Sequence, residues 1–152
     1  MALDLKTRLQ QDATAALRAR AEGRERLSVL RLALSEIKNA EIDRRGPLEE
    51  DAVLAVIARG VRQRQETASE ARRLGREDAA AKAEAEIVVL REYLPEAIDP
   101  DALEVEVDRA IAEVGAQGPR DLGKVMTLLI PRLRGRAGGE AIQAAVRRRL
   151  GG

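Results

Sequence analysis

Cations are the residues of this sequence whose type and spacing point most directly to chemistry. Residues 118–150 read GPRDLGKVMTLLIPRLRGRAGGEAIQAAVRRRL and carry seven arginines and one lysine against two acids. Guanidinium groups match phosphate oxygens in a two-pronged geometry, so this segment is a candidate phosphate-binding surface. Charge runs are also common on solvated helix faces. The sequence alone leaves both interpretations open.

The distribution of charge is more informative than its total, which is only +1. Residues 95–113 hold seven acids and one arginine, a net charge of −6, whereas residues 114–152 hold eight basic residues and two acids, a net charge of +6. Residues 1–94 contain 18 basic and 17 acidic residues, well interspersed. The separation of acidic from basic residues within residues 95–152 therefore favours either an anion-binding surface or ion pairing between the two parts.

Five cations near two expected helix ends are the candidate RNA-binding residues. They are Arg120, Lys124, Arg132, Arg134 and Arg136. Lys124 is expected one turn into a helix capped by Asp121, near N–H groups that attract anions. The three later arginines are expected in a glycine-rich loop after Pro131, where backbone can approach a phosphate closely. We expect a smaller contribution from residues 147–149, because cations at a helix end already suit its dipole.

The residue types that are missing exclude most catalytic chemistry. The chain has no cysteine and no histidine, which removes thiolate nucleophiles, the usual general base and the usual transition-metal ligands. No GxxxxGK[ST] phosphate loop occurs. We therefore expect no catalytic residue, no cofactor and no metal, and no glutaminase or ATPase activity from the chain alone. Carboxylate and lysine chemistry stays open, although no pair of carboxylates stands out.

The scarcity of aromatic residues limits how nucleic acid could be held. Tyr93 is the only aromatic residue, so several stacking rings for single strands are not available, and a folded RNA backbone is the better ligand. No apolar run approaches the roughly 20 residues that span a bilayer, and the first residues do not resemble a signal peptide. We expect a soluble cytoplasmic protein without a membrane partner.

Composition and periodicity predict an all-α fold with a helical N-terminal domain over residues 1–95. An apolar stripe defines the first helix, which Gly23 is expected to end, and it consists of Leu5, Leu9, Ala13, Ala16 and Leu17. A second helix is expected over residues 24–44 and a third after Gly46-Pro47. Beyond Val61 the third helix turns polar and is expected to project past the core. A fourth helix is expected from Glu77 to the break at Pro95.

The polar part of the third helix carries interleaved charges. Its arginines and glutamates are Arg59, Arg62, Arg64, Glu66, Glu70, Arg72 and Arg73. Helical spacing predicts ion pairs of Arg62 with Glu66 and of Glu70 with Arg73. A solvated face is the favoured interpretation here.

A small C-terminal domain of three helices is expected over residues 96–152. The stretch PEAIDPD is predicted to be a linker. Helices are expected over residues 102–114, from Asp121 to Pro131, and along a last apolar stripe. That stripe consists of Ile142, Ala145, Val146 and Leu150.

Three phrases in this order resemble the YqeY family: RLSVLRLALSEIKNAEID, GREDAAAKAEAEIVVLREYLP and GKVMTLLIPRLRGRAGG. The same module resembles the C-terminal part of the GatB subunit of tRNA-dependent amidotransferases. That enzyme is a carbon–nitrogen ligase, which amidates glutamate or aspartate on mischarged tRNA with glutamine as donor. The family motifs GKVM and GRA fall on residues 123–126 and 135–137. Gly138 departs from the pattern, because relatives often have an acid there.

The resemblance implies an all-α fold whose C-terminal part holds tRNA, without the catalytic domains of the amidotransferase. The leading hypothesis is a non-catalytic helper that binds tRNA or another structured RNA and works beside amidotransferase subunits or a tRNA synthetase. One alternative is a direct contribution to amidation within a larger complex. The other is a protein-interaction module that docks through the polar helix after Val61 or through the acidic residues 96–113.

Overall fold

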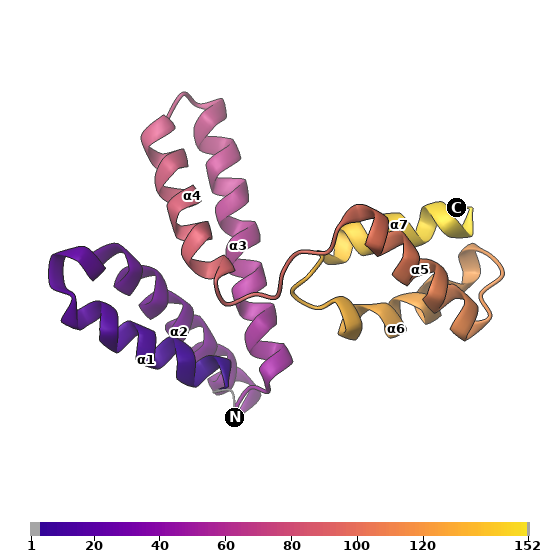
Figure 1. Ribbon diagram of the computed structural model, residues 1–152, viewed down its shortest axis with the longest axis horizontal. Coiled ribbons are helices and arrows are strands. Elements are labelled where there is room, and N and C mark those ends of the chain that lie inside the picture. Colours follow the sequence, from indigo (N-terminus) through magenta and orange to yellow (C-terminus); the bar gives the residue numbers. More distant parts are fainter. Residues whose placement is uncertain (1–3, 152) are drawn as a thin grey trace. The chain divides into compact units, whose positions relative to one another are not determined.

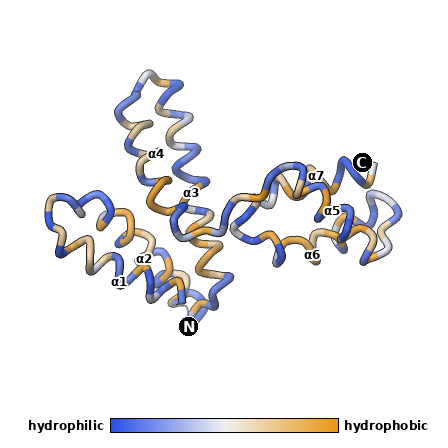
Figure 2. The backbone as a smooth tube through the Cα atoms, in the orientation of Figure 1, coloured by the Kyte–Doolittle hydropathy of each residue, from blue (hydrophilic) through white to orange (hydrophobic). Residues whose placement is uncertain are grey.

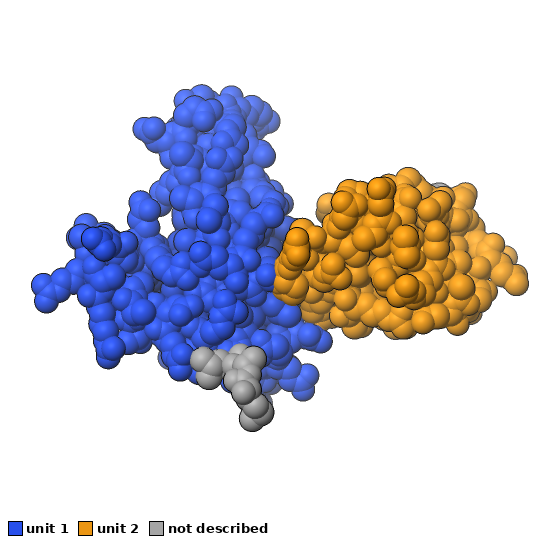
Figure 3. Space-filling model, in the orientation of Figure 1, with its two compact units in different colours: residues 1–94 blue, residues 95–152 orange. Residues whose placement is uncertain are grey.

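The computed structural model describes residues 4–151, and every regular element among them is helical. The helices form two compact units, the first ending at Leu94 and the second beginning at Pro95 (Figure 3). In chain order, α1 to α4 belong to the first unit and α5 to α7 to the second (Figure 1). The predicted all-α fold class is confirmed.

Two helical hairpins make up the first unit. α1 (Leu5–Arg18) and α2 (Arg24–Arg44) are joined by one turn of 3₁₀ helix, η1 (Arg20–Gly23). α3 (Glu50–Arg73) and α4 (Glu77–Arg91) form the second hairpin. The second helix thus has the bounds that its sequence predicts.

Gly23, just before α2, packs closely against the backbone of α1. A Cβ atom added there would lie 2.1 Å from the carbonyl oxygen of Ala16. The backbone φ of Gly23 is −96°, which any residue can adopt, so lack of space rather than conformation requires glycine. Gly23 was expected to end the first helix, but α1 already ends at Arg18. Gly23 instead closes the 3₁₀ turn.

A core shared by all four helices holds the first unit together. Its largest fully buried side chains are Leu9, Leu30, Ile37, Ile57 and Leu90. Leu17, predicted to lie on the first apolar stripe, is 53% exposed. Its neighbour Ala16 occupies the buried position against Gly23, and one step along a helix turns the next side chain by about 100° toward solvent.

The outer part of the α3–α4 hairpin is packed by alanines. Ala68 and Ala71 of α3 and Ala80 and Ala83 of α4 are at most 6% exposed and form a cluster separate from the main core. Gly75 turns the chain at the tip with a φ of +73°, a conformation that glycine adopts without strain. The polar end of the third helix therefore does extend past the main core, but α4 covers its alanine face (Figure 1).

Two carboxylates bind backbone N–H groups on other elements of the first unit. Glu50 in α3 accepts hydrogen bonds at 2.9 and 3.2 Å from the backbone N–H of Leu5, one of the free donors at the start of α1. Glu41 accepts from Lys6 Nζ at 2.7 Å and from the backbone N–H of Leu48 at 3.0 Å. These two hydrogen bonds, that of Lys6 first, hold the pKa of Glu41 below its usual value.

The side chain of Tyr93 is almost fully buried and contacts residues from other elements of the first unit. Its hydroxyl donates to Asp12 Oδ2 at 2.5 Å and accepts from Arg26 Nη2 at 2.9 Å. The guanidinium of Arg8 lies over the ring, 4.8 Å from its centre, a cation–π contact. Arg26 also binds Glu92 at 2.7 Å. The cluster ties α1 and α2 to the segment after α4.

Burial, together with the hydrogen bond to Asp12, raises the pKa of Tyr93 to about 12 from an ordinary value of 10.0. The folded state therefore favours the protonated phenol. Its contribution to stability is present below pH 10 and is lost as the pH rises toward 12. Because Tyr93 is the only tyrosine, absorbance of the phenolate reports on it alone. We expect ionisation near pH 12 in the folded protein and near 10 in urea. A midpoint near 10 in the folded protein would show that the cluster does not form.

A separate core forms the second unit between α5 (Pro100–Val114), α6 (Leu122–Leu133) and α7 (Gly139–Leu150). The 3₁₀ turn η2 (Pro119–Asp121) leads into α6. The buried side chains of this core are Leu103, Val107, Ala110, Val125, Leu129, Leu133, Ile142, Ala145 and Val146. Apolar residues dominate α6, while the charged residues of α7 lie near its two ends, with uncharged residues between them (Figure 2).

Two predictions about α6 are wrong. The helix does not end at Pro131 but continues to Leu133, with Pro131 inside its last turn. Proline removes one backbone hydrogen bond there, and burial of Leu133, which is 2% exposed, favours the continued helix. Asp121 stands at the N-cap position without capping α6. Its carboxylate accepts instead from the backbone N–H of Gln117 at 2.9 Å, which closes the loop before η2.

Hydrogen bonds anchor the start of the second unit to the loop between α6 and α7. The backbone N–H of Ile98 donates to the carbonyl oxygen of Arg136 at 2.9 Å. Arg136 Nε donates to the carbonyl oxygen of Glu96 at 3.1 Å. The segment PEAIDPD, predicted to be a linker, is thus tied at two points to the second unit.

Candidate nucleic-acid interface

The acidic and basic parts of the second unit meet as ion pairs. Arg132 at the end of α6 binds Glu113 of α5 at 2.7 Å. Arg149 of α7 binds both Glu104 and Asp108 of α5 at 3.1 Å. The carboxylates of α5 therefore neutralise part of the positive charge of residues 114–152.

These pairs lie at the surface and reduce, rather than abolish, the availability of the arginines. The side chains of Arg132 and Glu113 are 39% and 44% exposed. Exposed ion pairs stabilise a protein by about 0–1 kcal/mol, so a phosphate group that competes with the carboxylate has only that much to overcome. Arg148, 3.8 Å from Glu104, is paired more loosely.

Lys124 lies in the first turn of α6 and is 71% exposed. Its Nζ atom is 3.7 Å from Oδ1 of Asp121. The pKa of Asp121 is lowered, mainly by the hydrogen bond from Gln117 and further by the charge of Lys124. Arg132 follows eight residues later, about 12 Å along the helix axis. Lys124 and Arg132 therefore stand at opposite ends of α6 instead of forming one group.

The remaining predicted residues differ in what they bind. Arg136 is engaged by the carbonyl oxygen of Glu96, so its side chain helps to hold the loop. Arg120 in η2 and Arg134 after α6 have no carboxylate within 4.0 Å in the described part of the chain. Among the five predicted residues, these two have side chains that no ion pair or carbonyl oxygen of residues 4–151 engages.

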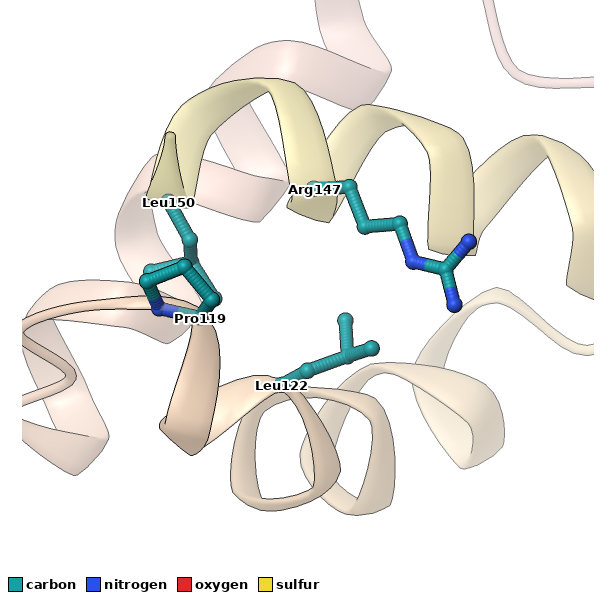
Figure 4. Close-up of a pocket in the computed structure, with 4 residues that line it drawn as sticks. All are labelled: Pro119, Leu122, Arg147 and Leu150. Atoms are coloured by element: carbon teal, nitrogen blue, oxygen red, sulfur yellow. The ribbon is translucent and has the colours of Figure 1, made fainter. Parts of the chain in front are cut away.

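Arg147 differs from its neighbours in a way that the sequence pattern does not indicate. Unlike Arg148 and Arg149, it has no carboxylate within 4.0 Å among residues 4–151. It faces η2 and the start of α6, where it lines a hollow with Pro119, Leu122 and Leu150 (Figure 4). Helical spacing is the one sequence signal that places Arg147 beside Leu150, because residues three apart lie on the same face of a helix.

The charges of α3 in the first unit are arranged as on a solvated helix. The predicted pair of Glu70 and Arg73 is present at 2.6 Å. The predicted pair of Arg62 and Glu66 is absent, since no N–O distance between them is within 4.0 Å. Arg64 reaches across to a carboxylate of α4 at 3.3 Å. Arg72 and Arg73 are also paired, whereas Arg59 and Arg62 have no carboxylate within 4.0 Å among residues 4–151, and the solvated face remains a prediction for them.

Two further features of residues 4–151 bear on the class of protein. None of their helices has both the length and the apolar composition for a bilayer crossing. No three potential ligand side chains gather there in a geometry suited to a metal ion. The chain is thus a small all-α protein of two helical units. In the second unit the acidic residues precede the basic ones in the sequence, whereas in the first unit they are interspersed.

The family model described as Yqey-like protein matches residues 6–150, nearly the whole chain. The protein belongs to the YqeY family, and the resemblance seen in its motifs is confirmed. No curated protein matches the chain.

Proposed function

We propose that this protein is a non-catalytic RNA-binding helper whose preferred ligand is tRNA. One observation carries the proposal: three arginines of the second unit, Arg120, Arg134 and Arg147, have no carboxylate partner in the described part of the chain. Such side chains can bind phosphate without first breaking an ion pair. They lie in the segment whose net charge is +6.

The other three predicted residues contribute to this interface to different degrees. Lys124 is loosely paired and exposed, and it adds a contact near the start of α6. Arg132 contributes less, because a phosphate must first displace Glu113. Arg136 contributes least through its side chain, since it holds the carbonyl oxygen of Glu96.

Folded RNA suits this surface better than an extended single strand. The only aromatic ring, that of Tyr93, is 3% exposed and cannot stack on a base. Recognition then rests on phosphates and shape, which is typical of structured RNA. The resemblance of the module to the tail of the GatB subunit supports tRNA as the RNA, and amidotransferase subunits or a tRNA synthetase as partners.

The ion pairs also weaken the alternative of an acidic protein-docking surface on α5. Three of its carboxylates, Glu104, Asp108 and Glu113, already face arginines of the same unit. A basic partner would have to displace those arginines before it could bind. No contact among residues 4–151 favours a catalytic contribution to amidation.

The proposal predicts that removal of the three unpaired arginines weakens tRNA binding and its dependence on salt. The variant combines Arg120→Ala, Arg134→Ala and Arg147→Ala. The slope of log K against log salt is negative, and each duplex phosphate that the variant no longer binds makes it shallower by up to about 0.9, so three such phosphates make it shallower by up to about 2.7. Fluorescence anisotropy with labelled tRNA at several salt concentrations measures both quantities. Circular dichroism should show unchanged helicity.

A matched variant removes the same charge from α3 by Arg59→Ala, Arg62→Ala and Arg73→Ala. We expect its salt slope to stay within error of the wild-type value, because these residues are assigned to a solvated face. Equal slopes for all three proteins would contradict the assignment of the arginines. Absence of tRNA binding by the wild-type protein would contradict the proposed function itself.

A further inference from the structure

The second unit contains a hollow of about 250 Å³ between α7 and the start of α6. Three of the four residues that line it are apolar: Pro119 of η2, Leu122 of α6 and Leu150 of α7. Figure 4 shows Pro119 and Leu150 close together at one end, with the guanidinium of Arg147 extending along the Leu122 side. An apolar surface thus lies directly beside a single cationic group.

The charges around the hollow select an anionic occupant. Arg147 has no carboxylate partner within residues 4–151, although both arginines that follow it do. Arg120, next to Pro119 in η2, also has none in that part of the chain. No acidic side chain of residues 4–151 lines the hollow. Arg120 is not among the residues that line the hollow, so the site offers the single cation of Arg147 to a ligand that also carries an apolar group.

The size of the hollow restricts that apolar group to about one ring or side chain. Pockets for drug-sized ligands occupy about 300–1,000 Å³, and this one lies below that range. A nucleobase has an apolar face and, within an RNA chain, is joined through its ribose to a phosphate, so one nucleotide satisfies both requirements. The guanidinium of Arg147 can bind the phosphate or lie flat on the exposed face of the base.

We propose that this hollow holds one unpaired nucleotide of a bound RNA, with the base against Pro119, Leu122 and Leu150 and its phosphate on Arg147. This proposal rests on the proposed function, since it names a subsite of the RNA-binding surface. It adds a preference for RNA in which an unpaired base adjoins a helix. The unpaired arginines alone would bind a blunt duplex equally well.

The test compares three RNA probes on the full chain: a blunt duplex, the same duplex with a short single-stranded overhang, and that overhang made abasic. The abasic probe carries the same phosphates without the bases. We expect the wild-type protein to bind the base-bearing overhang about fivefold more tightly than the abasic one, the lower end for a single base contact. Methyl NMR signals of Leu122 and Leu150 should shift with the base-bearing probe only.

Variants locate the effect. Leu150→Ala, which trims the apolar side of the hollow, should lower the preference for the base-bearing overhang to less than twofold. Arg147→Ala should weaken the binding of both overhangs, because both carry the phosphate, whereas Arg148→Ala, the same charge change one residue away, should do so less. Because the NMR experiment uses the wild-type chain, its result does not depend on the folding of a variant.

The possible outcomes separate this inference from the proposed function. Equal affinity for the base-bearing and abasic overhangs, with unshifted leucine methyl signals, would overturn the nucleotide subsite and leave RNA binding intact. No affinity for any RNA probe or for tRNA would overturn both. Leucine methyl shifts with an acidic leucine-containing peptide, and not with RNA, would identify a protein-docking site and overturn the subsite.

Discussion

Replacement of Gly23 by alanine is expected to destabilise the first unit by about 2–4 kcal/mol, at or above the usual cost of overpacking a core. The added Cβ would lie 2.1 Å from the carbonyl oxygen and 2.8 Å from the carbonyl carbon of Ala16. Both atoms are backbone, so no side chain can rotate away. Relief requires α1 and α2 to separate, which disturbs the core around Leu9 and Leu30. Urea unfolding followed by circular dichroism measures the decrease in stability.

Gly46→Ala is the matched control, because nothing lies within 4 Å of its added Cβ and its φ is not positive. We expect a change within about 0.5 kcal/mol, or slight stabilisation from a less flexible unfolded chain. If Gly23→Ala proved as stable as Gly46→Ala, the close approach of α1 and α2 would not exist in solution.

Substitution of Leu129 by alanine is expected to unfold much of the second unit. Leu129 is fully buried in a core of nine buried residues, and such truncations cost about 2–5 kcal/mol. The unit spans residues 95–152, or 58 residues, for which a typical total stability is about 3–9 kcal/mol. One substitution can therefore remove most of it. Hydrogen exchange followed by mass spectrometry should show reduced protection across α5, α6 and α7.

The same experiment should leave the protection of α2 unchanged, because its core residues belong to a different cluster. Val105→Ala is the control within the second unit, since Val105 is 55% exposed and its truncation should have little effect. An equal decrease of protection in α2 and α6 would show that the two cores unfold as one.

Periodicity predicts the elements of this protein well where apolar residues repeat at helical spacing. Along the first part of α3, before the helix turns polar beyond Val61 as expected, the buried residues recur at helical spacing: Val53, Val56, Ile57, Gly60 and Val61. The bounds of α2 follow from the same signal and from the Gly46-Pro47 break. Local rules fail at Pro131 and Asp121, because burial of Leu133 and a loop hydrogen bond outweigh the usual roles of these residue types.

Contacts between distant residues are not accessible to such reasoning. The partners of Tyr93, Asp12 and Arg26, lie 81 and 67 residues away in the chain. The candidate interface shows the same limit. The sequence predicts which segment is basic, but the selection of Arg147 over Arg149 depends on which arginines face the carboxylates of α5. Which arginines are paired is determined only when α5, α6 and α7 pack together.

The separate alanine cluster of the α3–α4 hairpin has a consequence for how this fold can vary. The main core reaches no further along the hairpin than Val61 and Ile87, and the alanines beyond it form a cluster of their own. Turns added to or deleted from both helices in equal number would move the tip without altering the main core. The length of the α3–α4 hairpin beyond Val61 and Ile87 can therefore change without altering the main core.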